Sequence, residues 1–307
     1  MSSANVTVEI EGHKLALSNL PKTLYPEAGF TKAQVIDYYT RIAPVLLPHL
    51  RGRPLTLKRY PNGVDAPFFY EKNCPSHRPP WVHTVTVPSE GSTGGRIDYC
   101  VVDNLATLVW IANLASLELH PNLAIGTDVG TPQSVVFDLD PGPPATIIEC
   151  ARVALLIKGL LDHSGLECVV KSSGSKGMQL YIPLNTPVTY EETKTFARSV
   201  AQLLESRREA GVVSSMKKSI RGGKVLVDWS QNDRHKTTVS VYSLRARARP
   251  TVSAPLTWDE VAAAAEGDAA AATFEADAVL RRVETHGDLF APLLEAKQSL
   301  PVIGRTA

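Results

Sequence analysis

The sequence predicts an α+β fold in which a mixed, mainly antiparallel sheet is packed with an N-terminal αβ portion. Strand patterns cluster between residues 133 and 245, helical patterns alternate with them, and the Pro/Gly-rich turns between them are short. This order of elements is typical of α+β domains. We therefore expect three consecutive parts: an N-terminal αβ portion (1–130), a central portion that carries most of the sheet (131–250) and a C-terminal helical segment (251–307).

The N-terminal portion opens with a strand and a capped helix. The stretch "VTVEIEG" alternates apolar and polar residues, which predicts a strand at 6–12. Thr31, with Gln34 three residues later, forms a capping box that starts a helix over 31–50. Pro44 lies within this helix and is expected to kink or break it. Further elements are expected in the order strand 54–61, strand 96–104 and apolar helix 104–120.

The second half of the chain carries most of the expected sheet. The patterns predict strands at 133–140, 167–184 (two strands joined by a Gly/Ser turn), 223–232 and 237–246, and helices at 147–163, 190–208 and from 258 onward.

Composition limits the class of protein. Hydrophobic residues make up 44% and charged residues 21%, as in soluble globular proteins. No stretch approaches the roughly 20 apolar residues of a membrane helix, and the N-terminus lacks a signal-peptide pattern. We expect a cytoplasmic, nucleoid-associated protein with no membrane partner. The widely spaced Cys74, Cys100, Cys150 and Cys168 form no CxxC motif and are expected to be reduced thiols.

Charge is distributed unevenly along the chain. Residues 207–249 hold 11 Lys/Arg against 3 acids, a net charge of +8. Residues 250–307 hold 9 acids against 4 bases, a net charge of −5. An asymmetry of this size favours a local field that attracts a polyanion.

Two aspartates end the apolar run in "QSVVFDLDPGPPA". Asp138 and Asp140 stand at i and i+2, so a regular strand places both on one face, while Leu139 points to the other. Two adjacent carboxylates repel each other unless a cation joins them. This pattern occurs in phosphatases, where the first Asp is the nucleophile, and in polymerases, where both hold metal. Asp228, after "KVLV", is the preferred third acid, with Asp103 as a competitor.

Basic residues flank these acids. The turn "SSGSKGMQ" offers backbone N–H groups and Lys176 to phosphate oxygens, although it is not a P-loop. The basic loop "SMKKSIRGGK" precedes Asp228. Arg245, Arg247 and Arg249 alternate along the strand expected there, which would line one face with guanidinium groups.

Seven segments in a fixed order resemble a known family. They are "LSNLPKTLYP", "TKAQVIDYYTRIAPVLLPHLRGRP", "KRYPNGVDAPFFYEKN", "VFDLDPG", "SGSKG", "KVLVDWSQN" and "TTVSVYSLRARARPTVSAPLTWDEV". The chain resembles the archaeo-eukaryotic primase superfamily, and within it the polymerase domain of the bacterial end-joining ligase D and its stand-alone relatives. The resemblance implies an RRM-like catalytic core and, given the "MSSANVTV" start, we expect a stand-alone enzyme.

The resemblance also implies a role for individual residues. Asp138, Asp140 and Asp228 would be catalytic and hold two Mg²⁺ or Mn²⁺ ions. Nucleotide contacts are implied for Lys58, His120, Ser173, Ser175, Lys176, Gln179, Gln231, Arg245 and Arg247, with Ser173 and Gln231 near the ribose 2′-hydroxyl. Asn19, Lys22 and Lys32 would bind the 5′-phosphate of a downstream DNA strand, Phe69 and Tyr70 would stack on template bases, and Arg221 belongs to the active-site loop.

One position departs from the family pattern. Gln179 stands where the family motif SGSKGxH ends in His. Glutamine can donate a hydrogen bond but cannot carry charge or protonate pyrophosphate. This departure bears on the strength of nucleotide binding or on the rate.

The residues together with the resemblance predict a metal-dependent nucleotidyltransferase that extends a 3′-hydroxyl. The resemblance implies that it acts at short gaps or double-strand break ends, with 5′-phosphorylated DNA, NTPs (ribonucleotides preferred) and a ligase or end-binding protein as partners. A non-catalytic DNA-end binder is the alternative, and it would not need the three acids. The phosphatase hypothesis is disfavoured because Pro141 follows the second Asp.

Overall fold

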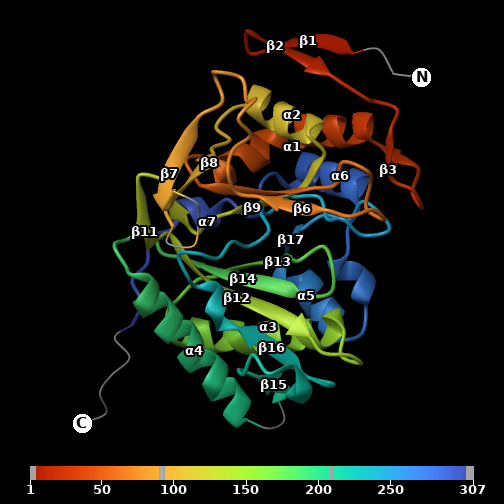
Figure 1. Ribbon diagram of the computed structural model, residues 1–307. Helices are drawn as coiled ribbons and strands as arrows, with labels where there is room; N and C mark the ends of the chain where they lie inside the picture. The colour runs from red at the N-terminus through yellow and green to blue at the C-terminus, as the bar shows by residue number, and fades with distance from the viewer. Residues whose placement is uncertain (1–4, 90, 92–93, 208–209, 302–307) are drawn as a thin grey trace. The chain divides into compact units, whose positions relative to one another are not determined.

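The computed structural model describes residues 5–89, 91, 94–207 and 210–301, and these form two compact units (Figure 1). Unit 1 consists of the chain up to Val129 together with Thr237–Ser253 and Phe274–Asp288. Unit 2 consists of Gly130–Lys236, Ala254–Thr273 and the chain from Leu289. Each unit is therefore assembled from three separate segments, whereas the expected division followed the chain consecutively.

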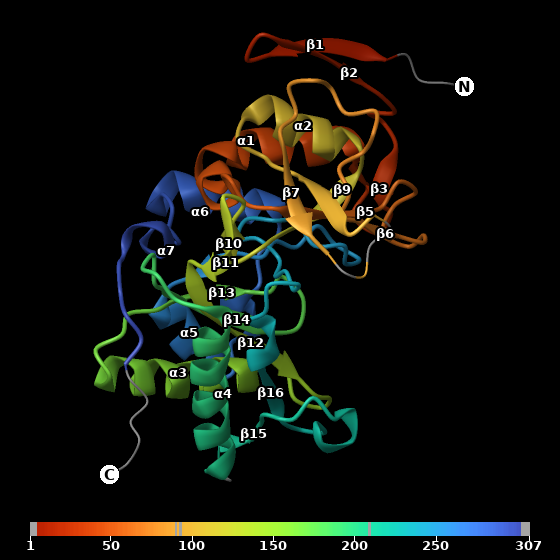
Figure 2. The same cartoon turned by 60° about the vertical axis from the view of Figure 1, so that its left-hand side comes forward.

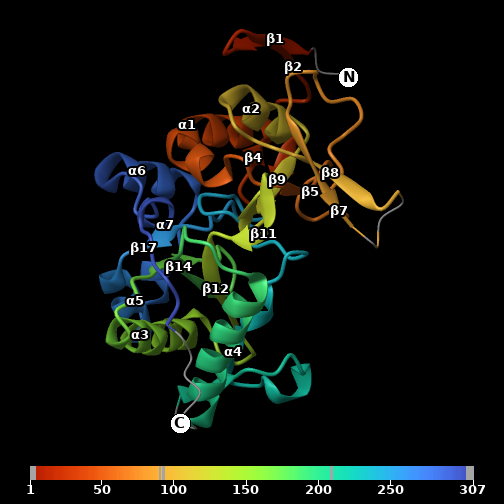
Figure 3. The same cartoon turned by 90° about the vertical axis from the view of Figure 1, so that its left-hand side faces the viewer.

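Unit 1 contains two layers, a sheet and helices. The sheet has the order β6-β5-β8-β7, and β9 also pairs with β5. Helix α1 packs against α2 and α6, as Figure 3 shows. The elements are β1 (Val6–Ile10), β2 (His13–Leu17), β3 (Thr23–Tyr25), β4 (Phe30–Thr31), α1 (Lys32–Leu50), β5 (Leu55–Arg59), β6 (Phe69–Glu71), β7 (Thr84–Pro88), β8 (Arg96–Cys100), α2 (Leu105–Asn113), β9 (Ser116–Pro121), β10 (Ala124–Ile125) and α6 (Ala276–His286).

Helix α1 begins as the sequence predicts but is not interrupted. Thr31 and Gln34 form the expected capping box. The helix continues through both Pro44 and Pro48 to Leu50, so the predicted break is wrong. Its apolar face is fully buried, and this burial outweighs the backbone hydrogen bonds that the prolines remove.

The apolar stretch 104–120 is not one helix. Helix α2 ends at Asn113, Ala115 takes a left-handed conformation (φ 58°), and β9 follows. Strand β9 pairs antiparallel with β5, and this pairing completely buries Leu117 and Leu119. A wholly apolar run has no clear period, so the sequence could not separate a buried helix from a buried strand.

Unit 2 is built on a six-stranded sheet with the order β15-β16-β12-β14-β13-β17. Only the β15–β16 pair is parallel. The elements are β12 (Ser134–Pro141), α3 (Ile147–His163), β13 (Val169–Ser172), β14 (Met178–Pro183), α4 (Tyr190–Ser206), β15 (Val212–Val213), η2 (Lys218–Ile220), β16 (Val225–Asp228), η3 (Trp229–Gln231), β17 (Pro255–Leu256), α5 (Trp258–Ala265), η4 (Ala269–Ala272) and α7 (Pro292–Glu295). Strand β11 (Asp128–Pro132) lies where the chain passes between units.

The core of unit 2 has the chain order β12-α3-β13-β14-α4-β16, in which β12 and β14 occupy the centre of the sheet. This is the βαββαβ arrangement. Helices α3 and α4 both contact β12, and Figure 2 shows them alongside the sheet. The predicted α+β class with a mainly antiparallel sheet is confirmed.

The expected strand at 237–246 is absent; within this described stretch only Leu244 forms an isolated bridge, to Val252. Two of its backbone N–H groups bond to distant partners, Ser240 to the Leu119 carbonyl and Leu244 to the Tyr39 hydroxyl, whereas those of Tyr242 and Arg245 bond to the Ser253 and Thr251 carbonyls. Tertiary contacts therefore replace the strand ladder that its alternating pattern indicates.

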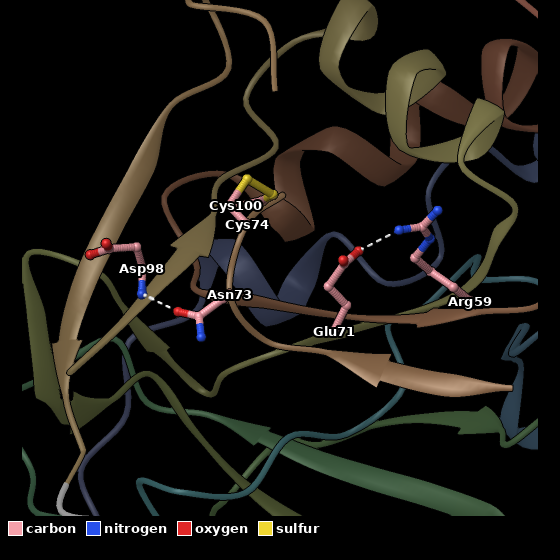
Figure 4. The surroundings of a disulfide bond; sticks show 6 residues. All are labelled: Arg59, Glu71, Asn73, Cys74, Asp98 and Cys100. Carbon is pink, nitrogen blue, oxygen red and sulfur yellow. Dashed lines mark hydrogen bonds and ion pairs between the residues drawn. A yellow bond between two sulfur atoms is a disulfide. The ribbon is translucent and has the colours of Figure 1, made fainter. Parts of the chain in front are cut away.

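Cys74 and Cys100 form a disulfide, so the expectation of four reduced cysteines is wrong (Figure 4). The backbone N–H of Cys74 donates to the Asp98 carbonyl, and the Asn73 side chain accepts from the Asp98 N–H at 3.1 Å. These bonds hold the chain after β6 against β8, which brings two cysteines 26 residues apart to a Cα–Cα distance of 4.8 Å. Sequence spacing does not reveal such proximity.

No helix in the described part of the chain is both long and apolar enough to cross a membrane.

Candidate active site

A row of polar side chains crosses the sheet of unit 2. Asp138 on β12 pairs directly with Asp228 on β16 and, on its other side, with Gln179 on β14. Gln179 pairs in turn with Lys171 on β13. Directly paired residues of antiparallel strands point to the same face, with Cβ atoms about 4.5–5.5 Å apart. We call Asp228, Asp138, Gln179 and Lys171, together with Asp140 two residues beyond Asp138, the polar row.

Asp140 extends the polar row at the end of β12. It lies two residues beyond Asp138 and so faces the same side. Its side chain is exposed, whereas Asp138 is half-buried and Leu139 between them is fully buried. The two aspartates of the motif therefore share a face, as their spacing predicts.

Asp138 is held in an environment that disfavours its charge. Burial raises its pKa to about 7, and the nearby carboxylates of Asp140 and Asp228 contribute to the rise. The hydrogen bond from Gln179 and the positive charge of Lys171 act in the opposite direction. A carboxylate under this repulsion gains stability when a cation joins the group.

Gln179 connects Asp138 to a buried lysine. Its amide nitrogen donates to Asp138 Oδ1 at 3.0 Å, and its carbonyl oxygen accepts from Lys171 Nζ at 2.5 Å. Gln179 is 4% exposed and Lys171 is 1% exposed. The glutamine at the family's histidine position is therefore a bridge within the polar row, with both ends of its amide engaged.

Asp228 is oriented by residues that follow it. Its Oδ1 accepts from the backbone N–H and the hydroxyl of Ser230, and its Oδ2 accepts from the Gln231 amide at 2.9 Å. Lys236 donates to the Ser230 hydroxyl. Gln231 thus contacts the acid itself, and Ser230 and Lys236 are contacts that the sequence did not indicate.

The turn between β13 and β14 lies close to the aspartate strand. A Cβ on Gly177 would sit 1.9 Å from the Leu139 carbonyl oxygen, so only glycine allows this approach. The Ser173 hydroxyl accepts from the N–H groups of Ser175 and Gly177 and so closes the turn. Lys176 is exposed at its tip, where it can reach an anion.

The basic loop that contains Arg221 packs against Gly142, directly after the aspartate strand β12. Gly142 after β12 donates to the Lys224 carbonyl, and a Cβ on Gly142 would meet the Arg221 carbonyl oxygen at 2.0 Å. The Arg221 guanidinium donates to the Met216 carbonyl at 2.6 Å. This contact explains why glycine follows the Asp-x-Asp-Pro sequence.

The three acids fit divalent cations by chemistry. Carboxylate oxygens are the ligands that Mg²⁺ and Mn²⁺ prefer, and the three side chains share one face of the sheet. Within the described ranges, no three or more His, Cys, Asp and Glu side chains already form a group that could hold a metal ion. The oxygens of Asp138 and Asp228 are engaged instead by Gln179, Ser230 and Gln231.

Unit 1 gathers a second set of predicted residues around Glu118. Its carboxylate lies 3.5 Å from Lys58 Nζ, 3.0 Å from His120 Nε2 and 3.4 Å from Arg245 Nε. Glu118 is 2% exposed. Burial alone would raise its pKa, but the His120 hydrogen bond and the charges of Arg245 and Lys58 hold that pKa well below its usual range. We call these four residues the Glu118 cluster.

The expected row of three arginines is not formed. Because 237–246 is not a strand, Arg245, Arg247 and Arg249 do not share a face. Arg245 pairs with Glu118, Arg249 pairs with Glu275, and Arg247 is exposed. Of the three, Arg245 is the one that belongs to the cluster.

The two predicted stacking aromatics point to opposite faces of β6. Tyr70 pairs with Lys58 and lies near His120, with ring centroids 6.2 Å apart. Phe69 pairs with Arg59, whose guanidinium lies 5.1 Å from the ring centroid. Both are exposed, Phe69 to 43% and Tyr70 to 58%. Each face of β6 therefore carries one exposed aromatic ring, and the two rings do not form a continuous stacking surface.

The lysines predicted to bind a 5′-phosphate lie together. The Lys32 backbone N–H donates to the Lys22 carbonyl, and Asn19 (φ 54°) forms the turn that precedes Lys22. Lys32 is buried and donates to the Ser18 carbonyl at 2.7 Å. Burial, assisted by the charges of Lys22 and Arg59, lowers its pKa to about 8. Lys22 is exposed and donates to the Asn62 side chain.

The chain is similar to a family of known proteins. The family model "LigD, primase-polymerase domain" matches residues 31–290. The multifunctional non-homologous end joining protein LigD of Mycolicibacterium smegmatis is 42% identical over 91% of this chain, and the bifunctional LigD of Bacillus subtilis is 31% identical over 94%. The chain spans 36% and 46% of these relatives' lengths.

A solved structure is also similar. The polymerase domain of Mycobacterium tuberculosis ligase D in complex with DNA matches with a TM-score of 0.84 and 40% identity. The match covers 92% of this chain and 99% of that one. The chain therefore belongs to the LigD primase-polymerase domain family.

Proposed function

We propose that this chain is a metal-dependent nucleotidyltransferase that extends a DNA 3′-hydroxyl with NTPs during the repair of gaps and double-strand breaks. The observation that carries the proposal is the direct pairing of Asp138 with Asp228, with Asp140 on the same face. Family membership supports it, because the relatives are named end-joining proteins and a similar polymerase domain was solved with DNA.

In this proposal the three aspartates hold two Mg²⁺ or Mn²⁺ ions. Such a pair of ions activates the 3′-hydroxyl and stabilises charge during in-line transfer of the α-phosphate. Gln179, Ser230 and Gln231 orient the carboxylates before the ions bind. The family resemblance assigns phosphate binding to Lys176 within unit 2 and, separately, to the basic residues of the Glu118 cluster within unit 1.

The proposal assigns the DNA contacts to the surface of unit 1. Lys22 and Lys32 bind the 5′-phosphate of the downstream strand, and Phe69 and Tyr70 stack on unpaired template bases. The preference for ribonucleotides and the cooperation with a ligase or an end-binding protein follow from the family resemblance and belong to the same proposal.

Extension of a gapped DNA with NTP and Mn²⁺ tests this function. The wild-type chain should extend a gap that carries a 5′-phosphate more efficiently than the same gap without it. Lys22→Ala combined with Lys32→Ala should remove this preference and reduce the salt dependence of DNA binding. Tight DNA binding without extension would instead favour a non-catalytic DNA-end binder, and an unchanged preference in the double variant would reject the phosphate pocket.

A further inference from the structure

We propose that Glu118 is a positioning residue that organises Lys58, His120 and Arg245 into one binding site for the phosphates of the incoming nucleotide. The inference rests on the proposed function and deepens it. The phosphate-binding side chains come from three separate segments, and the Glu118 carboxylate contacts all three.

The strand register places the first two side chains on the face of Glu118. Lys58 on β5 pairs directly with Glu118 on β9, and His120 follows Glu118 by two residues. All three side chains therefore point to the same side of the sheet. Lysine has a long, flexible stem. Lys58 could therefore move independently of His120 if Glu118 did not contact both side chains.

The third segment, which carries Arg245, contacts the cluster through Glu118. The backbone N–H of Ala246 donates to Glu118 Oε1 at 3.1 Å, and Arg245 Nε lies 3.4 Å from Oε2. Residues 237–246 form one isolated bridge, Leu244 to Val252, and a few backbone bonds to residues 251–253, so side-chain contacts such as that of Glu118 add to what holds the segment against β9. Glu118 thus ties the arginine and the backbone beside it to β9.

The charge balance leaves the cluster suited to an anion. One carboxylate faces two permanent cations, Lys58 and Arg245, so the excess charge is positive. Lys58, His120 and Arg245 remain 13%, 13% and 17% exposed, whereas Glu118 is 2% exposed. The acid is therefore hidden behind the basic groups, which are the ones a ligand can reach.

A charge-removing substitution distinguishes positioning from simple electrostatics, because the two predict opposite signs. Glu118→Gln raises the net charge of the cluster by one, which alone would tighten the binding of an anion. If Glu118 acts by positioning, the same variant should bind inorganic triphosphate at least about tenfold more weakly, the loss of one charge-assisted contact. Isothermal titration of the whole chain with inorganic triphosphate measures this directly, and equal or tighter binding would overturn the proposal.

Kinetics and two further variants exclude a general loss of structure. In primer extension, Glu118→Gln should raise KM for NTP more than it lowers kcat, and Glu118→Asp should recover part of the affinity because it keeps the charge. Asp288→Asn is the matched control, since Asp288 is also a carboxylate of unit 1 bonded to a histidine, His49, at 2.8 Å. It should reduce thermal stability while leaving triphosphate affinity unchanged; an equal loss of affinity in this control would mean that Glu118 has only a structural role.

The two proposals can fail separately. A wild-type chain that binds triphosphate but never extends a primer would reject the polymerase function and leave the titration of Glu118→Gln as the test of positioning. Extension with an unchanged KM for NTP in Glu118→Gln would reject the positioning role alone.

Discussion

The two polar clusters of this chain have opposite arrangements of charge: basic groups surround one acid in the first, and acids predominate in the second. In unit 1, a single buried acid, Glu118, collects Lys58, His120 and Arg245. In unit 2, three acids share one face, and a single buried cation, Lys171, reaches them through Gln179.

The difference lies in how completely each cluster is neutralised. The basic groups around Glu118 hold its pKa well below the usual range, so the charge of Glu118 is compensated within the protein. Burial and neighbouring carboxylates raise the pKa of Asp138 to about 7, so the charge of Asp138 is not compensated. The comparison indicates that Glu118 is neutralised by groups of the protein itself, whereas a bound cation would stabilise the Asp138 carboxylate.

Removing one acid from the polar row should have the largest effect on activity. Asp140→Ala is expected to reduce primer extension by at least roughly a thousandfold, because a carboxylate that holds metal stabilises the transferring phosphoryl group. Asp140 is exposed, so the fold should be unchanged. Extension assays and DNA binding should be measured together; normal extension by Asp140→Ala would show that the polar row does not hold the catalytic metal.

Unit 1 differs from unit 2 in having a covalent link. Replacing both Cys74 and Cys100 by Ser should lower the free energy of unfolding by about 3.5 kcal/mol, the chain-entropy value for a loop of this length. Denaturant unfolding measures the change, and Cys168→Ser, which alters a free cysteine, is the control. Recovery of four free thiols from the wild-type chain under oxidising conditions would contradict the link.

The bridge between Lys171 and Asp138 sharpens the comparison further. Gln179→Leu should destabilise the protein by about 2 kcal/mol, because the buried Lys171 ammonium and Asp138 both lose a hydrogen-bond partner. Gln179→His should cost less, since a neutral imidazole offers one donor and one acceptor. Equal stability of the Leu variant and the wild type would mean that the bridge does not stabilise the row.

The sequence predicted best those features that depend on local pattern. The capping box at Thr31 and the Asp-x-Asp strand lie where the pattern indicates, since capping and strand alternation are read from adjacent residues. The segment 237–246 shows the opposite case. It alternates like a strand, but its hydrogen-bond partners are divided between residues 251–253 and distant groups such as the Leu119 carbonyl and the Tyr39 hydroxyl.

The residues that organise the two clusters could not be predicted. Glu118 stands in "SLELH" and Lys171 in "VVKSS", where each is one charged residue in an apolar strand. Their importance depends on strand register, which joins Glu118 to Lys58 and Lys171 to Gln179. The sequence gives one indication of their role: a charged residue within an apolar strand must find a partner when the strand is buried.

The pH dependence of stability follows from Asp138. Its pKa rises from 3.8 to about 7 on folding, so between these values the native state keeps a proton that the unfolded state releases. This group therefore lowers stability as pH rises from about 4 to 7. Divalent cations should reverse the loss above pH 7, and Asp140→Ala should weaken both effects.

Binding of Mn²⁺ to the wild-type chain, followed by electron paramagnetic resonance at pH 8, tests most directly whether Asp138, Asp140 and Asp228 form a metal site. We predict two bound ions, weaker binding at pH 5.5 where Asp138 is protonated, and a loss of bound Mn²⁺ in Asp140→Ala. The same number of ions and the same affinity in wild type and variant would contradict the account.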